Sequence, residues 1–164
     1  MASGNSLQVW GPAANQPPSS NFAVTDTRNG TLVLVFDDTI INAAIFPGFL
    51  PRNYSGGGLK AMVIWAAATA TTGDVRWRGS FERLADGVDT IASDSFGSTQ
   101  TITTTTAGTA GIVKYSTIIF TDGAQIDSLL LGEAFRFKLE RFASDAADTM
   151  AGNAQAIRVE LRET

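Results

Sequence analysis

The residues whose type and spacing come nearest to a chemical site are aspartates in loops. Asp37 and Asp38 adjoin a strand-like segment, residues 86–94 hold three more aspartates, and Asp145 lies near Asp148. A polysaccharide hydrolase needs two carboxylates about 5 to 10 Å apart across a cleft, and calcium binds carboxylate and carbonyl oxygens. No group has the spacing of an EF-hand loop, and aspartate beside glycine, serine or threonine is typical of turns. We therefore predict no catalytic residue and no metal site, with Asp37 and Asp38 as the pair to mutate in a test for hydrolysis.

The sequence contains no cysteine and no histidine. Disulfides, thiolate chemistry, cysteine- or histidine-based zinc sites and histidine acid–base catalysis are therefore excluded together. There is no G-x-S-x-G motif, and a serine–lysine pair would have to use Lys60, Lys114 or Lys138, none of which lies in a recognisable motif. We predict that the protein is not an enzyme.

Three consecutive glycines, Gly56–Gly58, raise the question of a phosphate-binding loop. Such a loop leads into a helix whose N-terminus faces the phosphate. Here the glycines precede the apolar, β-branched segment Leu59–Ala66, which favours a strand. We therefore expect neither a nucleotide nor any other cofactor.

Aromatic residues in loops offer a different chemistry, because the face of an aromatic ring can stack on a sugar. Trp65 and Trp77 fall on apolar strand faces and are expected in the core, whereas Trp10 and Tyr54 fall in loops. Arg52 and Asn53 precede Tyr54 and would complete a polar–aromatic surface. The segment predicts contact with a partner, either a carbohydrate or another subunit.

The elements that must position these residues are strands. Alternation of apolar and polar residues is clear in Glu133–Phe142, where Phe135, Phe137 and Leu139 share one face. The nearly apolar Leu59–Ala66 is expected to be central and covered on both sides, and the threonine-rich Thr99–Thr106 to lie at an edge or an interface. A short helix is expected around Ile126–Leu131. The predicted strands are Thr31–Asp37, Ile40–Leu50, Leu59–Ala66, Asp74–Leu84, Thr99–Thr106, Ile112–Thr121, Glu133–Phe142 and Ala156–Arg162.

These patterns predict an all-β protein in which two antiparallel sheets pack face to face, since each alternating strand has one face to bury. About eight strands of this length favour a jelly roll over an immunoglobulin-like sandwich. Residues 1–27 are rich in glycine, asparagine, proline and serine and read as an extended N-terminal arm before a sandwich domain of residues 28–164. The arm is expected to dock on its own domain or on a neighbour, through the apolar residues Leu7, Val9, Trp10 and Phe22.

Charge and hydropathy limit the partners further. The formal net charge is −4 and the basic residues are scattered singly, which disfavours nucleic acid as the main partner. The longest apolar run is too short to span a bilayer. The start of the sequence lacks a basic region followed by an apolar one, so we expect no signal peptide and synthesis in a cytoplasm.

Several segments resemble a group of uncharacterised virion proteins of tailed phages and prophages. The similar segments are DTRNG (26–30), VFDDT (35–39), IFPGFLPRNYSGGGLKAMVIWAA (45–67), VRWRGSFER (75–83), DSFGSTQT (94–101), YSTIIFTDGAQIDSLLLGEAFRFKLER (115–141) and DTMAGNAQAIRVEL (148–161). The resemblance runs over nearly the whole chain after residue 20 and brings no catalytic motif. It implies a jelly-roll structural protein that decorates or cements a capsid, or that forms part of a fibre or spike.

The main prediction is a capsid decoration (cement) protein, assembled in the host cytoplasm into the virion. Its partners would be the major capsid protein or another virion protein, and the resemblance implies a homo-oligomer, with a trimer favoured. The alternative is a receptor- or carbohydrate-binding component of a fibre or spike, which would use Arg52, Asn53, Tyr54 and the loop of residues 86–94. Cement proteins are present in far more copies than fibre proteins, so band intensity on a gel of virions would separate the two.

Overall fold

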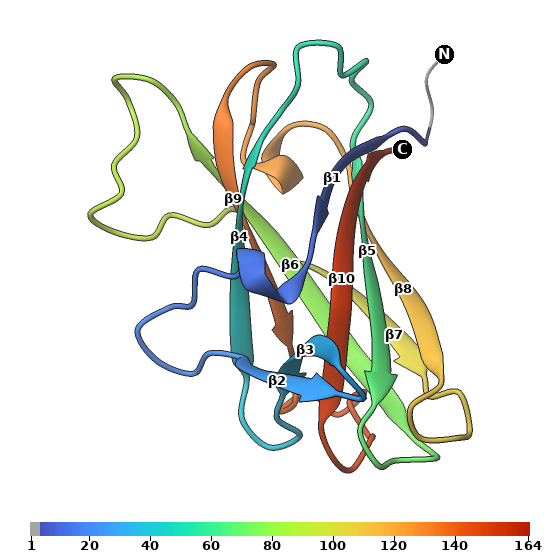
Figure 1. Cartoon of the computed structure of the whole chain (residues 1–164). Coiled ribbons are helices and arrows are strands. Elements are labelled where there is room, and N and C mark those ends of the chain that lie inside the picture. Colours follow the sequence, from blue (N-terminus) through green and yellow to red (C-terminus); the bar gives the residue numbers. More distant parts are fainter. Residues whose placement is uncertain (1–3) are drawn as a thin grey trace.

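The computed structural model describes residues 4–164, which form two antiparallel β-sheets packed face to face (Figure 1). Sheet A has six strands in the order β2-β3-β10-β5-β8, and β1 also pairs with β10. The strands of sheet A are β1 (Ser6–Trp10), β2 (Val24–Arg28), β3 (Thr31–Phe36), β5 (Leu59–Ala67), β8 (Val113–Phe120) and β10 (Ala154–Glu163).

Sheet B has four strands in the order β4-β9-β6-β7. Two short 3₁₀ turns, η1 (Pro12–Ala14) and η2 (Ala124–Ile126), lie in the connections. The strands of sheet B are β4 (Asn42–Phe49), β6 (Asp74–Leu84), β7 (Gln100–Thr105) and β9 (Ala134–Arg141). The predicted all-β two-sheet sandwich is confirmed, with ten strands in residues 4–164 instead of about eight, because the N-terminal region supplies β1 and β2.

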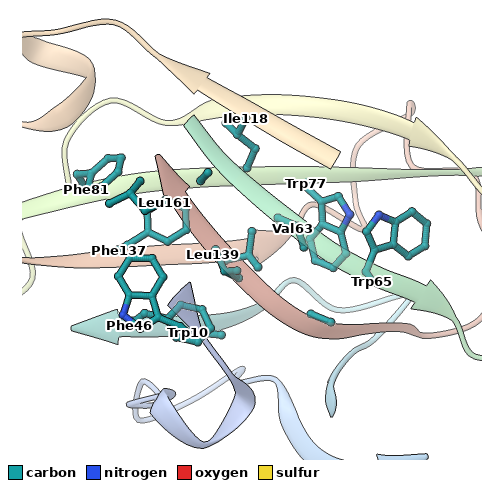
Figure 2. Packing of buried hydrophobic residues seen from close by; sticks show 14 of the residues in the cluster. Trp10, Phe46, Val63, Trp65, Trp77, Phe81, Ile118, Phe137, Leu139 and Leu161 are labelled. Atoms are coloured by element: carbon teal, nitrogen blue, oxygen red, sulfur yellow. The ribbon is translucent and has the colours of Figure 1, made fainter. Parts of the chain in front are cut away.

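The core between the sheets follows from the alternation of the strands. Phe135, Phe137 and Leu139 of β9 are buried as predicted, and Trp65 and Trp77 are fully buried and meet edge to face at 5.8 Å between ring centroids. Figure 2 shows this tryptophan pair on one side of the core and Trp10 beside Phe46 on the other. Strand β6 passes close to β9 at Gly79, where an added Cβ would lie 2.9 Å from the Phe137 ring. This explains the glycine within a strand.

Edge positions also agree with the sequence. Strand β7, which contains the threonine-rich segment, lies at one edge of sheet B, and β4, which contains Pro47, lies at the other. Proline lacks a backbone N–H and is tolerated at edges for that reason. The predicted helix at Ile126–Leu131 is reduced to the single turn η2, followed by Asp127 and Ser128 in left-handed conformations.

The N-terminal region is integrated into the sandwich. Strand β1 extends sheet A along β10, and residues 15–23 cover the exposed edge of β4. The Ile45 N–H donates to Asn15 Oδ1 at 2.9 Å, and the Ala43 N–H donates to the Asn21 carbonyl at 2.8 Å. Covering an edge strand protects it from pairing with other chains. Residues 1–3 of the predicted arm lie outside the described residues.

Within residues 4–164, no helix is both long and apolar enough to cross a membrane.

Candidate binding face on the six-stranded sheet

The loop aspartates serve the fold. Asp37 Oδ1 accepts hydrogen bonds from the Thr39 hydroxyl and from the N–H groups of Thr39 and Ile40, at 2.6 to 3.0 Å. These bonds, that of the Thr39 hydroxyl foremost, lower the pKa of Asp37. Its neighbour Asp38 accepts from the Gly152 N–H and thereby ties two loops together. The pair is therefore engaged in turn chemistry, as aspartates in loops commonly are.

Asp148 forms a buried ion pair with Arg141. Both side chains are almost fully buried, and Arg141 Nη2 lies 2.7 Å from Asp148 Oδ1. The same guanidinium donates to the carbonyls of Met150 and Gly152 at 2.6 and 2.7 Å. A carboxylate held in this way has no lone pair directed at solvent and is unsuited to acid–base work.

The loop of residues 86–94 is exposed along its whole length, with Val88 73% and Ile91 83% exposed, and a few polar bonds tie it to sheet B. Asp94 pairs with Arg136 at 2.8 Å, and the Ser95 N–H donates to buried Glu82 at 2.6 Å. Asp89 accepts from the Ala85 N–H. Within residues 4–164, no group of three or more acidic side chains is arranged to hold a metal ion.

The predicted surface at Arg52, Asn53 and Tyr54 differs from the expectation. Arg52 and Asn53 are exposed, but Tyr54 is only 6% exposed and belongs to the core. Its hydroxyl accepts from the Gly58 N–H at 2.8 Å, and burial raises the pKa of the phenol. Gly56–Gly58 all have positive φ, which other residues rarely adopt, so the glycines shape a turn around the tyrosine. Tyr54 therefore offers no ring face to a sugar.

The apolar residues of the arm separate into buried and exposed ones. Trp10 is 5% exposed, stacks on Phe46 and Phe137, and donates from Nε1 to the Pro47 carbonyl at 2.8 Å. It therefore docks on its own domain, in the core, and cannot serve as a contact for a partner. Leu7 is partly buried against the same core, whereas Val9 and Phe22 are 58% and 44% exposed.

The outer face of sheet A is the largest departure from the sequence analysis. Strand β5 is central, as predicted, but it is covered on one side only: its outward side chains Met62 and Ile64 are partly exposed. The neighbouring strand β8 adds Val113, Tyr115 and Ile119, which are 46%, 60% and 57% exposed. Exposed apolar side chains that gather on one sheet face are typical of a binding surface. We call the outer side of β10, β5 and β8 the binding face.

Register places the side chains of the binding face in rows across the strands. Arg158 of β10 lies opposite Ile64, which lies opposite Tyr115 of β8. Another row pairs Gln155 with Ala66 and Val113. In both rows β10 supplies the polar group and β5 and β8 supply the less polar ones, with the exposed ring of Tyr115 on the edge strand β8.

An irregularity in β10 alters the groups that the binding face presents. The register between β10 and β5 shifts between Ala156 and Arg158, so one extra residue stands in β10. Ile157 is partly buried and Arg158 exposed, while Ala156 and Val159 on either side are buried. A bulge re-aims side chains in this manner and is frequent next to functional sites. It brings two consecutive side chains to the outside of the sheet.

Two hollows adjoin the binding face. One, of about 260 Å³, lies beside Ala66, Val113 and Gln155, and the other, of about 400 Å³, lies beside Ile157 and Arg158. The β2–β3 turn forms a wall of both, and the segment Gly11–Ala13 bounds the second. The turn is an Asn29-Gly30 hairpin with positive φ at both residues, the geometry that suits a tight two-residue connection.

Arg28 closes the end of the smaller hollow. Its Nη1 donates to the Ala67 carbonyl at 3.0 Å and to Gln155 Oε1 at 2.8 Å. These bonds fix the planar guanidinium beside Gly111, where an added Cβ would lie 2.6 Å from Nη2. The hollow thus presents fixed planar polar groups next to an apolar floor, as ligand pockets commonly do.

Sequence reasoning did not single out Tyr115. Both faces of its segment are apolar, since Ile118 and Phe120 point inward while Tyr115 and Ile119 point outward. Periodicity alone cannot tell which of two apolar faces stays uncovered. The sequence did contain one indication of an uncovered face: two segments, Leu59–Ala66 and Ile112–Thr121, are each apolar on both sides of the strand.

The fold is an antiparallel two-sheet β-sandwich. No protein-family model and no curated protein sequence matches the chain. Its structure is similar to part of a family 115 4-O-methyl-α-glucuronidase with specificity for decorated arabinogalactans, with a TM-score of 0.55 and 11% identity. That match covers 98% of this chain, but the chain spans only 18% of the enzyme.

Two further similarities are weaker. A carbohydrate-binding module of Cellvibrio mixtus lichenase 5A, in complex with cellotriose, has a TM-score of 0.49 and 14% identity, covering 98% of this chain and 99% of the module. The enzymatically active domain of bacteriophage CBA120 tailspike protein 4 has a TM-score of 0.37 and 8% identity, covering 98% of this chain and 19% of that one. Neither similarity reaches a TM-score of 0.5, and the resemblance to phage virion proteins stays a prediction.

Proposed function

We propose that the protein is a carbohydrate-binding module without catalytic activity and that its glycan lies along the binding face of sheet A. The observation that carries this proposal is Tyr115, a 60% exposed aromatic ring on the edge strand β8 of an uncovered, partly apolar sheet face. This is the alternative predicted from the sequence, moved from the Tyr54 loop to a sheet.

The chemistry of the binding face suits a sugar. A pyranose ring has an apolar C–H face that packs on an aromatic ring, and its hydroxyl groups bond to fixed polar side chains. Tyr115 and Ile64 supply the apolar surface, and Arg158, Gln155 and Arg28 supply planar groups around it. Glu160, the carboxylate on this face, is engaged by the Ser6 hydroxyl. This arrangement supports binding and provides no pair of carboxylates for hydrolysis.

Affinity electrophoresis through gels that contain soluble polysaccharides tests the proposal. We expect Tyr115→Ala to weaken binding of the retained polysaccharide about tenfold, since loss of one aromatic contact costs about 1 to 1.5 kcal/mol. Tyr115→Phe should bind nearly as well as the parent chain. Phe49→Ala is the matched control, because Phe49 is a 46% exposed aromatic residue on the opposite sheet.

Equal retention of Tyr115→Ala and the parent chain would contradict the assignment of this face. If no polysaccharide retards the protein, and Tyr115→Ala instead lowers the mass of an oligomer in solution, the face is a subunit interface. That outcome would favour the capsid decoration role and the virion partners predicted from the resemblance.

A further inference from the structure

Five of the twelve basic residues are in ion pairs within residues 4–164, and seven are not, among them Arg52, Lys114 and Lys138 outside the binding face. Among residues 4–164, the ion pairs involve five arginines, all on β6 and β9 of sheet B: Arg76, Arg78, Arg83, Arg136 and Arg141. Four other cations, Arg28, Lys60, Arg158 and Arg162, lie on or beside the binding face, and within the described chain none has a carboxylate oxygen within 4.0 Å. A protein with a net charge of −4 thus keeps an unpaired basic strip on one sheet.

Two of these cations face each other directly. Lys60 of β5 and Arg162 of β10 are partners in the strand register, so both project from the same side of the sheet. Like charges opposite one another destabilise a pair of strands. Within residues 4–164, the Met62 sulfur at 3.6 Å is the one hydrogen-bond partner of the Arg162 guanidinium, and its Nε–H is buried without an acceptor. An anion bound between Lys60 and Arg162 would remove the repulsion and satisfy the donor.

The strip runs along β10 across the binding face. Four residues of β10 separate Arg162 from Arg158, or about 13 Å at the rise of a strand, and Arg28 lies farther on, bonded to Gln155. Tyr115 stands in the Arg158 row, between the two ends. Negative charges repeated along an extended chain would meet these cations in turn.

We propose that the glycan is an anionic polysaccharide whose carboxylate or sulfate groups bind Arg158 and the Lys60–Arg162 pair. This inference rests on the proposed function and names its class of ligand. Arginine presents a planar fork that matches a carboxylate in two parallel hydrogen bonds, which gives direction as well as attraction. Glu160 lies between the basic rows and is held by Ser6, so it separates two anion positions along the strip.

Affinity electrophoresis with four probes tests the charge: polygalacturonate, its fully methyl-esterified form, dextran sulfate and dextran. Polygalacturonate and its ester share a backbone and differ in charge, and dextran sulfate separates sulfate from carboxylate. We expect the parent chain to prefer polygalacturonate to its ester by at least tenfold, and moderate salt to reduce the preference. Arg158→Gln and Lys60→Gln should each weaken polygalacturonate binding about tenfold, the loss expected for one charge-assisted contact.

Lys138→Gln is the matched control, since it removes one positive charge from sheet B, where Lys138 faces the Phe96 ring at 4.4 Å. It should bind like the parent chain. Equal binding of polygalacturonate and its ester, with no effect of Arg158→Gln, would overturn the charge proposal. The glycan proposal would stand in that case if Tyr115→Ala still binds more weakly than the parent chain. A preference for dextran sulfate over polygalacturonate would assign sulfate to the strip. Binding of single-stranded DNA in preference to all four polysaccharides would overturn both proposals.

Discussion

Trp10 connects the N-terminal strand to the core, and its removal gives the sharpest test of the structure. The ring is 95% buried and contacts Phe46 at 5.5 Å, Phe137 at 6.0 Å and Phe135 at 6.2 Å between centroids. Burial of a large aromatic side chain removes about 150 to 250 Å² from water, worth about 4 to 6 kcal/mol at 25 cal/mol per Å². This value is an upper limit because the unfolded chain already buries part of that surface.

We therefore expect Trp10→Ala to lower the free energy of unfolding by about 4 kcal/mol, within the range measured for such truncations. Trp10→Phe keeps the stacking on Phe46 and Phe137 but loses the hydrogen bond to the Pro47 carbonyl, so its cost should be about 1 to 2 kcal/mol. Val9→Ala is the control. Val9 is 58% exposed, and its replacement should change stability by no more than about 0.5 kcal/mol.

Urea unfolding followed by far-ultraviolet circular dichroism measures these differences without relying on the fluorescence of the residue that is removed. A loss below about 1 kcal/mol for Trp10→Ala would refute the placement of Trp10 in the core. A midpoint that rises with protein concentration in the parent chain, and not in Trp10→Ala, would show that the tryptophan docks in a second copy.

Three further predictions concern the fold. Arg141→Met should destabilise the protein by about 3 to 5 kcal/mol in the same assay, because it leaves the Asp148 carboxylate buried without its partner. A loss of stability smaller than that caused by replacing an exposed arginine with methionine would contradict this. Folding lowers the pKa of Asp37 below its unfolded value of 3.8. The Asp37 carboxylate therefore stabilises the folded chain above pH 3.8, and this stabilisation is lost as the pH falls through the folded-state pKa. In Asp37→Asn, the melting temperature should therefore fall less steeply below pH 3.8 than in the parent chain. The same dependence of melting temperature on pH in both proteins would contradict the role of Asp37 in this turn. Gly79→Val should prevent folding or lower the melting temperature strongly, since its side chain would overlap the Phe137 ring; the yield of soluble protein and the melting curve check this.

Local pattern determined most of the fold. A strand has a period of two residues wherever it lies, so alternation in Glu133–Phe142 identified the inward side of β9 without knowledge of its neighbours. The threonine-rich segment was expected at an edge or an interface and lies at the edge of sheet B, because an edge tolerates polar side chains. These features depend on a residue and its immediate neighbours in the chain.

The local sequence pattern did not predict the burial of two aromatic residues, Tyr54 and Trp10. Tyr54 follows two polar residues and precedes three glycines, which indicated an exposed ring, yet the turn folds its hydroxyl back onto the Gly58 N–H. Trp10 lay in a segment without periodicity and fills the core because β1 pairs with β10, whose residues lie about 150 positions away. The burial of both rings depends on contacts that a local window does not contain.

The sequence by itself determined an all-β sandwich without histidine or cysteine chemistry. Only the tertiary structure decided which face of the sandwich is left uncovered. Strands β5 and β8 are apolar on both sides, and the sheet that faces them covers one side and leaves the other open. Tyr115 meets Ile64 and Arg158 through register between strands distant in sequence, and the bulge in β10 turns Arg158 outward. A binding face is a property of neighbouring strands, so it emerges only when they pair.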